Sequence, residues 1–273
     1  MPANPSETHI SRGYVIPIGG EVEKTNDPVI LERFFALSGG TNANILVIPT
    51  ASELTETGPD YARLFESLGC RSRFIPVDER EDCFKEEIQA ALKEASGIFI
   101  TGGNQLRLST ILGGTPVAKL IRSLNANGVH VAGTSAGAAI MSEHMIAGGA
   151  SGPTPRENGV TMAPGLGLTN KIIIDQHFSQ RDRIGRLMTA LSYNPFISGI
   201  GIDENTAAFI DPDGLLEVLG SGAITVLDPD ELSHSSMANT LHQEPITLIG
   251  MKLHILASGA RYDINTREAY SER

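Results

Sequence analysis

Short apolar runs, many with β-branched residues, alternate along the first half of the chain with segments whose apolar residues recur every three or four positions. The runs predict buried strands, and the periodic segments predict helices with one buried face. Asp27 is the expected N-cap of the first helix, with Pro28 at its first position. We expect strands at 14–18, 44–49, 73–77, 97–101 and 129–132, and helices at 28–37, 59–68, 82–95, 106–112 and 116–124.

This alternation predicts an α/β fold with a mainly parallel sheet that is covered by helices on both faces. A further strand at 172–177 and a helix at 181–192 follow a long, Gly-rich connection at 146–167. Beyond Pro195, short strands near 197–202, 207–210, 215–219, 223–227, 246–249 and 254–257 predict C-terminal β-hairpins added to the sheet. Residues 1–12 are predicted to be a disordered tail, and residues 13–273 a single domain.

Composition excludes several classes of partner. The formal net charge is −11, which argues against nucleic acid and anionic membranes, because both need a basic surface. No apolar run approaches the length that spans a bilayer, and the first twelve residues lack the apolar region of a secretion signal. Two cysteines, Cys70 and Cys83, form neither a metal-binding spacing nor a disulfide framework. We therefore predict a cytoplasmic protein.

The segment Gly133-Thr134-Ser135-Ala136-Gly137 joins the strand at 129–132 to a helix that begins at Ala136. G-x-S-x-G between a strand and a helix is the spacing of a nucleophile elbow, in which a strained turn lifts the serine hydroxyl out of the sheet. The glycines are needed because a sharp turn leaves no room for side chains. The alternative is a small-residue turn where strand and helix pack closely.

A serine nucleophile needs a base within hydrogen-bond reach and a third group that orients the base. His177 follows a strand end after the elbow, at the edge where Ser135 should emerge, and is the preferred base. Asp175, Asp203 and Glu204 are the candidate orienting acids, and strand spacing does not choose among them. A solvated acid in a turn is the alternative for each.

Two backbone N–H groups are expected to stabilise a developing oxyanion. Ala136 follows the nucleophile, and Gly103 follows the strand at 97–101, whose carboxyl end should meet the same sheet edge. The alternative for Gly102-Gly103 is an ordinary tight turn. Neither a complete G-x-G-x-x-G nor a Walker A motif occurs, and no paired ligand spacing suggests a metal, so we predict that no cofactor is required.

Five motifs in this order resemble those of cyanophycinases, which share a family of serine peptidases with dipeptidase E on a class I glutamine-amidotransferase-like, flavodoxin-related α/β fold. The motifs lie at 101–108, 132–139, 144–149, 175–178 and 201–204. The resemblance implies a triad of nucleophile Ser135, base His177 and orienting Glu204. It also implies a substrate pocket lined by Gln105, Asp175, Gln176, Arg181, Arg183 and Arg186, and it suggests a homodimer.

Helical geometry limits that pocket. If 181–186 were helical, Arg183 and Arg186 would share a face, whereas Arg181 would lie about 200° away from Arg183. All three arginines reach the site only if Arg181 precedes the helix, and Arg183 is the first choice.

The resemblance implies a serine-type exopeptidase that releases β-aspartyl-arginine dipeptides from cyanophycin, a poly-aspartate with arginine on each β-carboxyl. Each repeat offers a free carboxylate for an Arg and a guanidinium for an Asp or Glu. The alternatives are an aspartyl dipeptidase of the dipeptidase E type and a catalytically silent binding protein on the same fold. A nucleotide-binding domain is disfavoured because phosphate-binding loops are absent.

Overall fold

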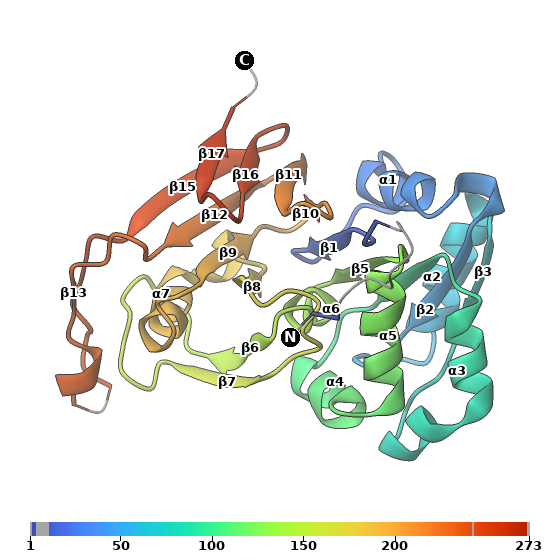
Figure 1. Ribbon diagram of the computed structural model, residues 1–273, viewed down its shortest axis with the longest axis horizontal. Helices are drawn as coiled ribbons and strands as arrows, with labels where there is room; N and C mark the ends of the chain where they lie inside the picture. Colours follow the sequence, from blue (N-terminus) through green and yellow to red (C-terminus); the bar gives the residue numbers. More distant parts are fainter. Residues whose placement is uncertain (1, 4–10, 242, 272–273) are drawn as a thin grey trace.

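A nine-stranded sheet, in the order β17-β16-β11-β10-β1-β5-β4-β2-β3, organises the larger part of the molecule in the computed structural model (Figure 1). The structure describes residues 2–3, 11–241 and 243–271. The parallel part of the sheet comprises β1 (Val15–Ile18), β2 (Asn44–Ile48), β3 (Arg71–Phe74), β4 (Gly97–Ile100) and β5 (His130–Thr134). The antiparallel extension comprises β10 (Thr206–Ile210), β11 (Leu215–Gly220), β16 (Arg261–Asp263) and β17 (Glu268–Tyr270).

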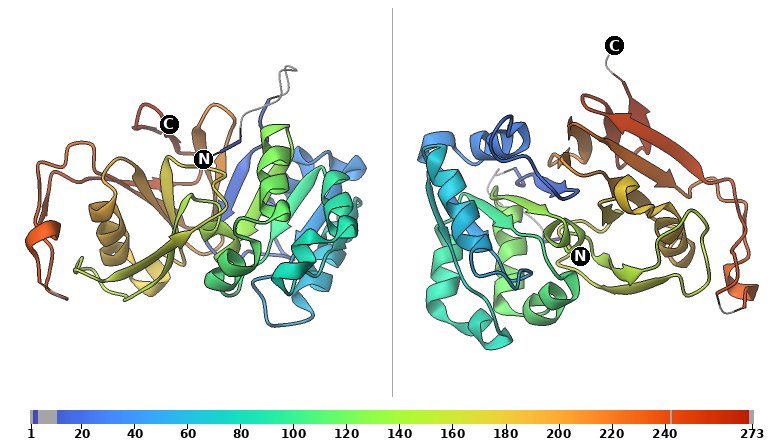
Figure 2. Two further views of the ribbon diagram at one scale, coloured as in Figure 1. Left: turned by 60° about the horizontal axis from the view of Figure 1, so that its bottom comes forward. Right: turned by 180° about the vertical axis from the view of Figure 1, so that it is seen from behind.

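Helices cover both faces of the parallel strands (Figures 1 and 2). Alternate residues of β2 show how: Ile45 and Val47 pack with α1 (Val29–Leu37) and α2 (Thr57–Ser67). Leu46 and Ile48 belong to the opposite core, with α3 (Glu86–Lys93), α4 (Gln105–Leu112) and α5 (Pro116–Ala126). Strands buried on both faces have the continuous apolar character seen in the sequence.

A second sheet, in the order β15-β12-β9-β8, lies beside the first. Its strands are β8 (Ile172–Gln176), β9 (Ser198–Ile202), β12 (Ala223–Asp228) and β15 (Lys252–Ala257). A third core forms where α7 (Ile184–Tyr193) packs with β8 and with the ribbon of β6 (His144–Gly149) and β7 (Val160–Pro164). The remaining elements in the described part of the chain are β13 (His234–Ser235), β14 (Leu248–Ile249), the short helix α6 (Ala136–Ala139) and four 3-10 turns, at Gly40–Asn42, Arg80–Phe84, Ser179–Arg181 and Met237–Asn239.

The predicted fold class is confirmed: helices flank a largely parallel central sheet, and extra C-terminal strands are present. Not all of those strands extend that sheet, however. Strands β10 and β11 do, whereas β9, β12 and β15 join β8 in the second sheet, where β9 is its direct neighbour. The predicted tail at 1–12 falls largely on residues 1 and 4–10, which lie outside the described residues. Among the described residues, no helix combines the length and apolarity needed to cross a bilayer.

Three local predictions are wrong. Helix α1 begins at Val29 with Pro28 at its N-cap, and no side chain caps it, so Asp27 is not the cap. The helix predicted over 82–95 is a 3-10 turn followed by α3, because the side chains of Glu79 and Asp82 close a capping box around that turn and Lys85 is extended. The connection predicted over 146–167 contains the antiparallel ribbon of β6 and β7.

Candidate active site

Ser135 occupies a strained turn between β5 and α6. Its φ and ψ are 53° and −112°, and its N–H donates to the Ile18 carbonyl at 2.9 Å. A Cβ on Gly133 would lie 2.5 Å from the Gly137 carbonyl oxygen, and one on Gly137 would lie 2.2 Å from the carbonyl oxygen of Ile100. Both glycines are therefore required by close backbone approach, and the serine projects from the carboxyl end of its strand.

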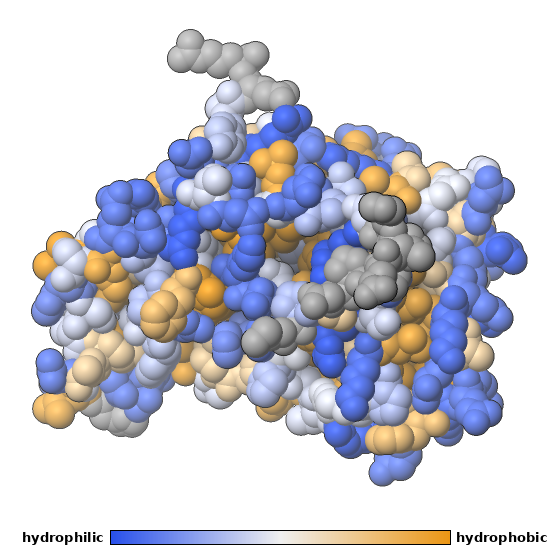
Figure 3. All heavy atoms as spheres, viewed as in Figure 1, coloured by the Kyte–Doolittle hydropathy of each residue, from blue (hydrophilic) through white to orange (hydrophobic). Residues whose placement is uncertain are grey.

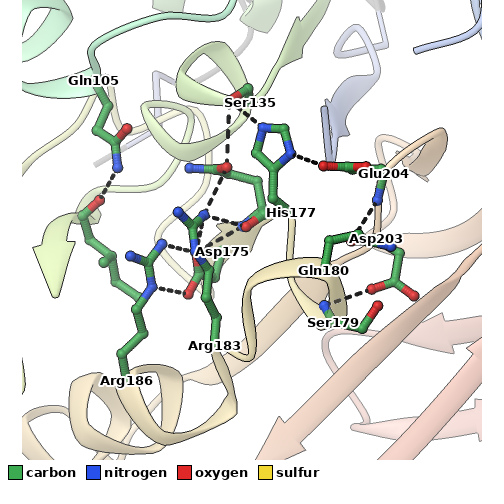
Figure 4. Close-up of polar contacts among 12 residues, drawn as sticks. Gln105, Ser135, Asp175, His177, Ser179, Gln180, Arg183, Arg186, Asp203 and Glu204 are labelled. Carbon is green, nitrogen blue, oxygen red and sulfur yellow. Dashed lines mark hydrogen bonds and ion pairs between the residues drawn. The ribbon is translucent and has the colours of Figure 1, made fainter. Parts of the chain in front are cut away.

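His177 reaches Ser135 from the second sheet. It follows β8 with a φ of 46°, and its N–H donates to the Gly19 carbonyl at 2.7 Å. Its Nε2 lies 2.9 Å from the Ser135 hydroxyl oxygen (Figure 4). A Cβ on Gly20 would lie 2.2 Å from the imidazole, so the turn after β1 packs directly against the ring. These contacts hold the imidazole beside the hydroxyl.

Glu204, from the turn between β9 and β10, completes a continuous chain of polar contacts. Its carboxylate lies 2.6 Å from Nδ1 of His177, and Figure 4 draws this contact as a dashed line. Asp203 points elsewhere, because its carboxylate oxygens accept from the N–H groups of Ser179 and Ala223 at 3.0 and 3.2 Å. Asp175 pairs with Arg186. Of the three acids that spacing left open, Glu204 is the one in contact with the imidazole.

The surroundings of His177 favour its neutral form. Burial lowers the pKa of the imidazole, the hydrogen bond that the ring donates to Glu204 opposes that shift, and the charge of Arg181 adds to the lowering. The net direction is downward. A neutral ring with Nδ1–H directed at a carboxylate presents an unprotonated Nε2 to the serine hydroxyl, which is the state a general base needs.

Asp175, Gln176, Arg183 and Arg186 form a buried polar network next to Ser135. Arg186 binds Asp175 through two nitrogens, with Nε at 2.7 Å. Arg183 donates to the Gln176 side-chain oxygen at 2.9 Å, and burial lowers the pKa of its guanidinium to about 10, so it remains charged at neutral pH. The same Gln176 oxygen lies 3.4 Å from the hydroxyl oxygen of Ser135. The network therefore ends at the Ser135 hydroxyl.

Of the other predicted site residues, some line the cavity at Ser135 and the others lie in the elements around it. Arg181 lies in a 3-10 turn before α7 and lines the same cavity as Ser135 and His177. Gln105 begins α4 and donates to the Ile146 carbonyl at 3.0 Å, which links that helix to the ribbon. Gly103 lines the cavity, and a Cβ on it would lie 2.0 Å from the Ala51 carbonyl oxygen. Ala136 is fully buried at the start of α6.

The cavity at Ser135, with a volume of about 350 Å³, also contains residues that the sequence analysis missed. These come from the turn after β1, from the segment between β2 and α2, and from α2 itself. They include Glu21, Lys24, Ser52, Thr57 and Tyr61. The first two strands end at the same sheet edge as β5, so the rule that sites form at the carboxyl ends of parallel strands was the available signal. Within the part of the chain that the structure describes, no three His, Cys, Asp or Glu side chains cluster closely enough to hold a metal ion.

Sequence comparison relates the chain to a family of peptidases. The sequence model described as "Peptidase family S51" matches residues 15–218. Cyanophycinase from Trichormus variabilis is 45% identical over 256 residues, which cover 93% of this chain and 86% of that protein. Cyanophycinase from Geminocystis herdmanii is 40% identical over 260 residues, which cover 94% of this chain and 96% of that protein. The similarity thus extends over nearly the whole chain.

Solved structures share the fold at low sequence identity. A peptidase from an acI-B1 actinobacterium has a TM-score of 0.63 at 23% identity, covering 89% of this chain and 98% of that one. A putative peptidase E protein from Listeria monocytogenes has a TM-score of 0.56 at 20% identity, and the match covers 78% of this chain and 100% of that protein. The first of these matches spans most of the chain, whereas the second leaves about a fifth of it unmatched.

Proposed function

Because this chain belongs to peptidase family S51, a family of serine-type peptidases, we propose that it hydrolyses cyanophycin to β-aspartyl-arginine dipeptides as an exopeptidase. The observation that carries the proposal is the unbroken contact chain from Ser135 through His177 to Glu204. The relatives named cyanophycinase, at 40–45% identity over more than nine-tenths of the chain, support the choice of substrate.

In this proposal Ser135 is the nucleophile. Its oxygen attacks the scissile carbonyl of the aspartyl backbone while Nε2 of His177 accepts its proton. Glu204 holds the imidazole in the tautomer with hydrogen on Nδ1 and stabilises the imidazolium that forms. The imidazolium then protonates the leaving amine, and water hydrolyses the acyl-enzyme by the reverse sequence of proton transfers.

The N–H groups of Ala136 and Gly103 are the proposed oxyanion donors. Ala136 follows the nucleophile at the start of α6, and the Gly102-Gly103 turn lies against Ser135, since a Cβ on Gly102 would be 3.2 Å from the serine Cβ. The two glycines carry no side chains, so the reacting carbonyl can approach their backbone closely.

Among the residues proposed to bind substrate, Arg181 lines the cavity with Ser135 and His177, which supports direct contact with the substrate. Arg183, Arg186 and Asp175 are 8%, 5% and 1% exposed, and each already has an internal partner. We therefore infer that these three act mainly by holding Gln176 and the backbone next to Ser135 in position. We infer that Gln105 likewise holds the ribbon of β6 and β7 in position relative to α4.

The proposal is tested by incubating the purified protein with insoluble cyanophycin granules and identifying the soluble products by mass spectrometry. We expect β-aspartyl-arginine, and we expect none from Ser135→Ala at equal folded concentration. Hydrolysis of free aspartyl dipeptides without action on granules would support an aspartyl dipeptidase instead. Binding to granules without any product would support a catalytically silent protein.

We further propose a homodimer that works in the cytoplasm. Leu253 and Ile255 of β15 are 48% and 68% exposed on the edge strand of the second sheet, a surface that association of two copies would cover. Light scattering during size-exclusion chromatography tests the dimer: a mass near 58 kDa, about twice the chain's 29.1 kDa, is expected, and a monomer at working concentration would contradict it.

A further inference from the structure

The cavity that exposes Ser135 and His177 continues over elements that the proposed mechanism does not use. One wall of the cavity is built from Glu21 and Lys24, which follow β1, from Leu54, which precedes α2, and from Tyr61 within α2. The volume, about 350 Å³, lies in the range of sites that hold a small ligand or one residue of a longer one. The wall therefore has room for a part of the substrate beyond the scissile bond.

Charges of both signs line this wall. Glu21 supplies a carboxylate, whereas Lys24 and Arg181 supply cations. The Lys24 Nζ lies 4.5 Å from the centre of the Tyr61 ring, so the aromatic face stabilises one of these cations. Each repeat of the proposed substrate has a matching pair of charges, because its arginine is joined through the α-amino group and keeps both a free carboxylate and a guanidinium.

The turn that carries Glu21 is fixed relative to the imidazole. Gly20 packs against His177, and the Gly20 carbonyl accepts from the N–H of Asn205 at 2.8 Å. Asn205 also accepts from the Glu23 N–H at 3.0 Å. Glu21 itself has a φ of 41°, a left-handed conformation that disfavours residues with a Cβ. A glutamate held there, next to the catalytic ring, points to a use for its side chain.

We propose that this wall is the subsite for the arginine of one of the two repeats that flank the scissile bond, with the Glu21 carboxylate accepting hydrogen bonds from the guanidinium. Lys24 and Arg181 then face the free carboxylate of the same arginine, and Leu54 and Tyr61 contact its methylene groups. The subsite rests on the proposed function, since it needs this polymer as substrate. It makes Glu21 a determinant of specificity that does not take part in bond cleavage.

The test uses synthetic substrates of two β-aspartyl-arginine repeats, which contain a single scissile bond, together with two analogues in which one or the other arginine is replaced by citrulline. Citrulline keeps the shape of arginine without its charge. Because a hydrogen bond to a charged group in a partly exposed site is a modest interaction, Glu21→Gln should lower kcat/KM on the parent substrate about ten-fold. On one of the two citrulline analogues the same substitution should have almost no effect.

Glu53→Gln is the matched control, because Glu53 is exposed between Ser52 and Leu54, which line the cavity, but does not line it itself. It should leave all three kcat/KM values unchanged. Glu21→Asn, which tolerates a positive φ, is the second variant if Glu21→Gln lowers the melting temperature, and it should give the same pattern. Equal losses for Glu21→Gln on the parent and on both analogues would overturn the subsite. Failure of the unaltered protein to cleave either the parent substrate or granules would instead overturn the proposed function, and the subsite with it.

Discussion

The sharpest consequence of the site concerns Glu204→Gln. The carboxylate lies 2.6 Å from Nδ1 of His177 and is 31% exposed. With about 4 Å between charge centres and an effective dielectric constant of about 20, its attraction to the imidazolium is about 4 kcal/mol, roughly a 10³-fold effect on rate. Because partial exposure screens this interaction, we expect kcat to fall by about 10²–10³-fold. A glutamine that turns its NH₂ toward Nδ1 would add to the loss by selecting the wrong tautomer.

Asp203→Asn is the matched comparison, since it removes one charge from the neighbouring residue. Its oxygens accept hydrogen bonds from two backbone N–H groups, so the variant should lose stability by about 1 kcal/mol while kcat stays within ten-fold of normal. The assay is dipeptide release from soluble cyanophycin oligomers at saturating substrate, with folding monitored by circular dichroism. Similar small losses in both variants would refute the assignment of Glu204 as the orienting acid.

Further predictions concern the imidazole and its supports. Because the pKa of His177 is lowered, kcat/KM should rise with pH through a midpoint below the usual histidine value of about 6.5. Arg181→Gln removes a charge that lowers this pKa, so it should move the midpoint upward. An unchanged midpoint in the pH–rate profile of that variant would contradict this. Gly20→Ala should reduce kcat about 10²-fold or more by displacing the imidazole, and a normal rate would show that the ring is not confined there. Asp175→Ala should cost about 3–5 kcal/mol in urea denaturation because it leaves Arg186 buried without its partner, and a loss below about 1 kcal/mol would show that the pair is not structural.

The parallel half of the fold was predictable because each of its elements is encoded locally. Apolar runs gave β1, β2, β4 and β5, and the G-x-S-x-G spacing placed Ser135 at a strand end. The capping interactions were less predictable, since the helix predicted from Asp82 is interrupted by contacts between Glu79 and Asp82 that periodicity does not reveal. The pairing of β9 with β8 on one side and with β12 on the other, in a separate sheet, depends on contacts between distant segments, which no local pattern encodes.

The contacts within the site were predictable only in part. Resemblance selected Glu204, whereas spacing alone left Asp175 and Asp203 equally open. The side chains of Asp175 and His177 do not share one face of a strand, because the backbone at His177 has a φ of 46° and leaves the strand. Glu21 gave no signal in the sequence, since its importance arises from a positive φ and from proximity to a ring more than 150 positions away.

The central claim is that the Ser135 hydroxyl is activated by His177, and covalent labelling tests it most directly. A peptidyl or fluoro-phosphonate reacts with an activated serine to give a stable adduct, which peptide mass spectrometry locates. We expect a single adduct on Ser135, formed at least 10²-fold more slowly in His177→Ala, in line with the contribution of a general base. An adduct on another residue, or equal labelling rates with and without His177, would contradict the account.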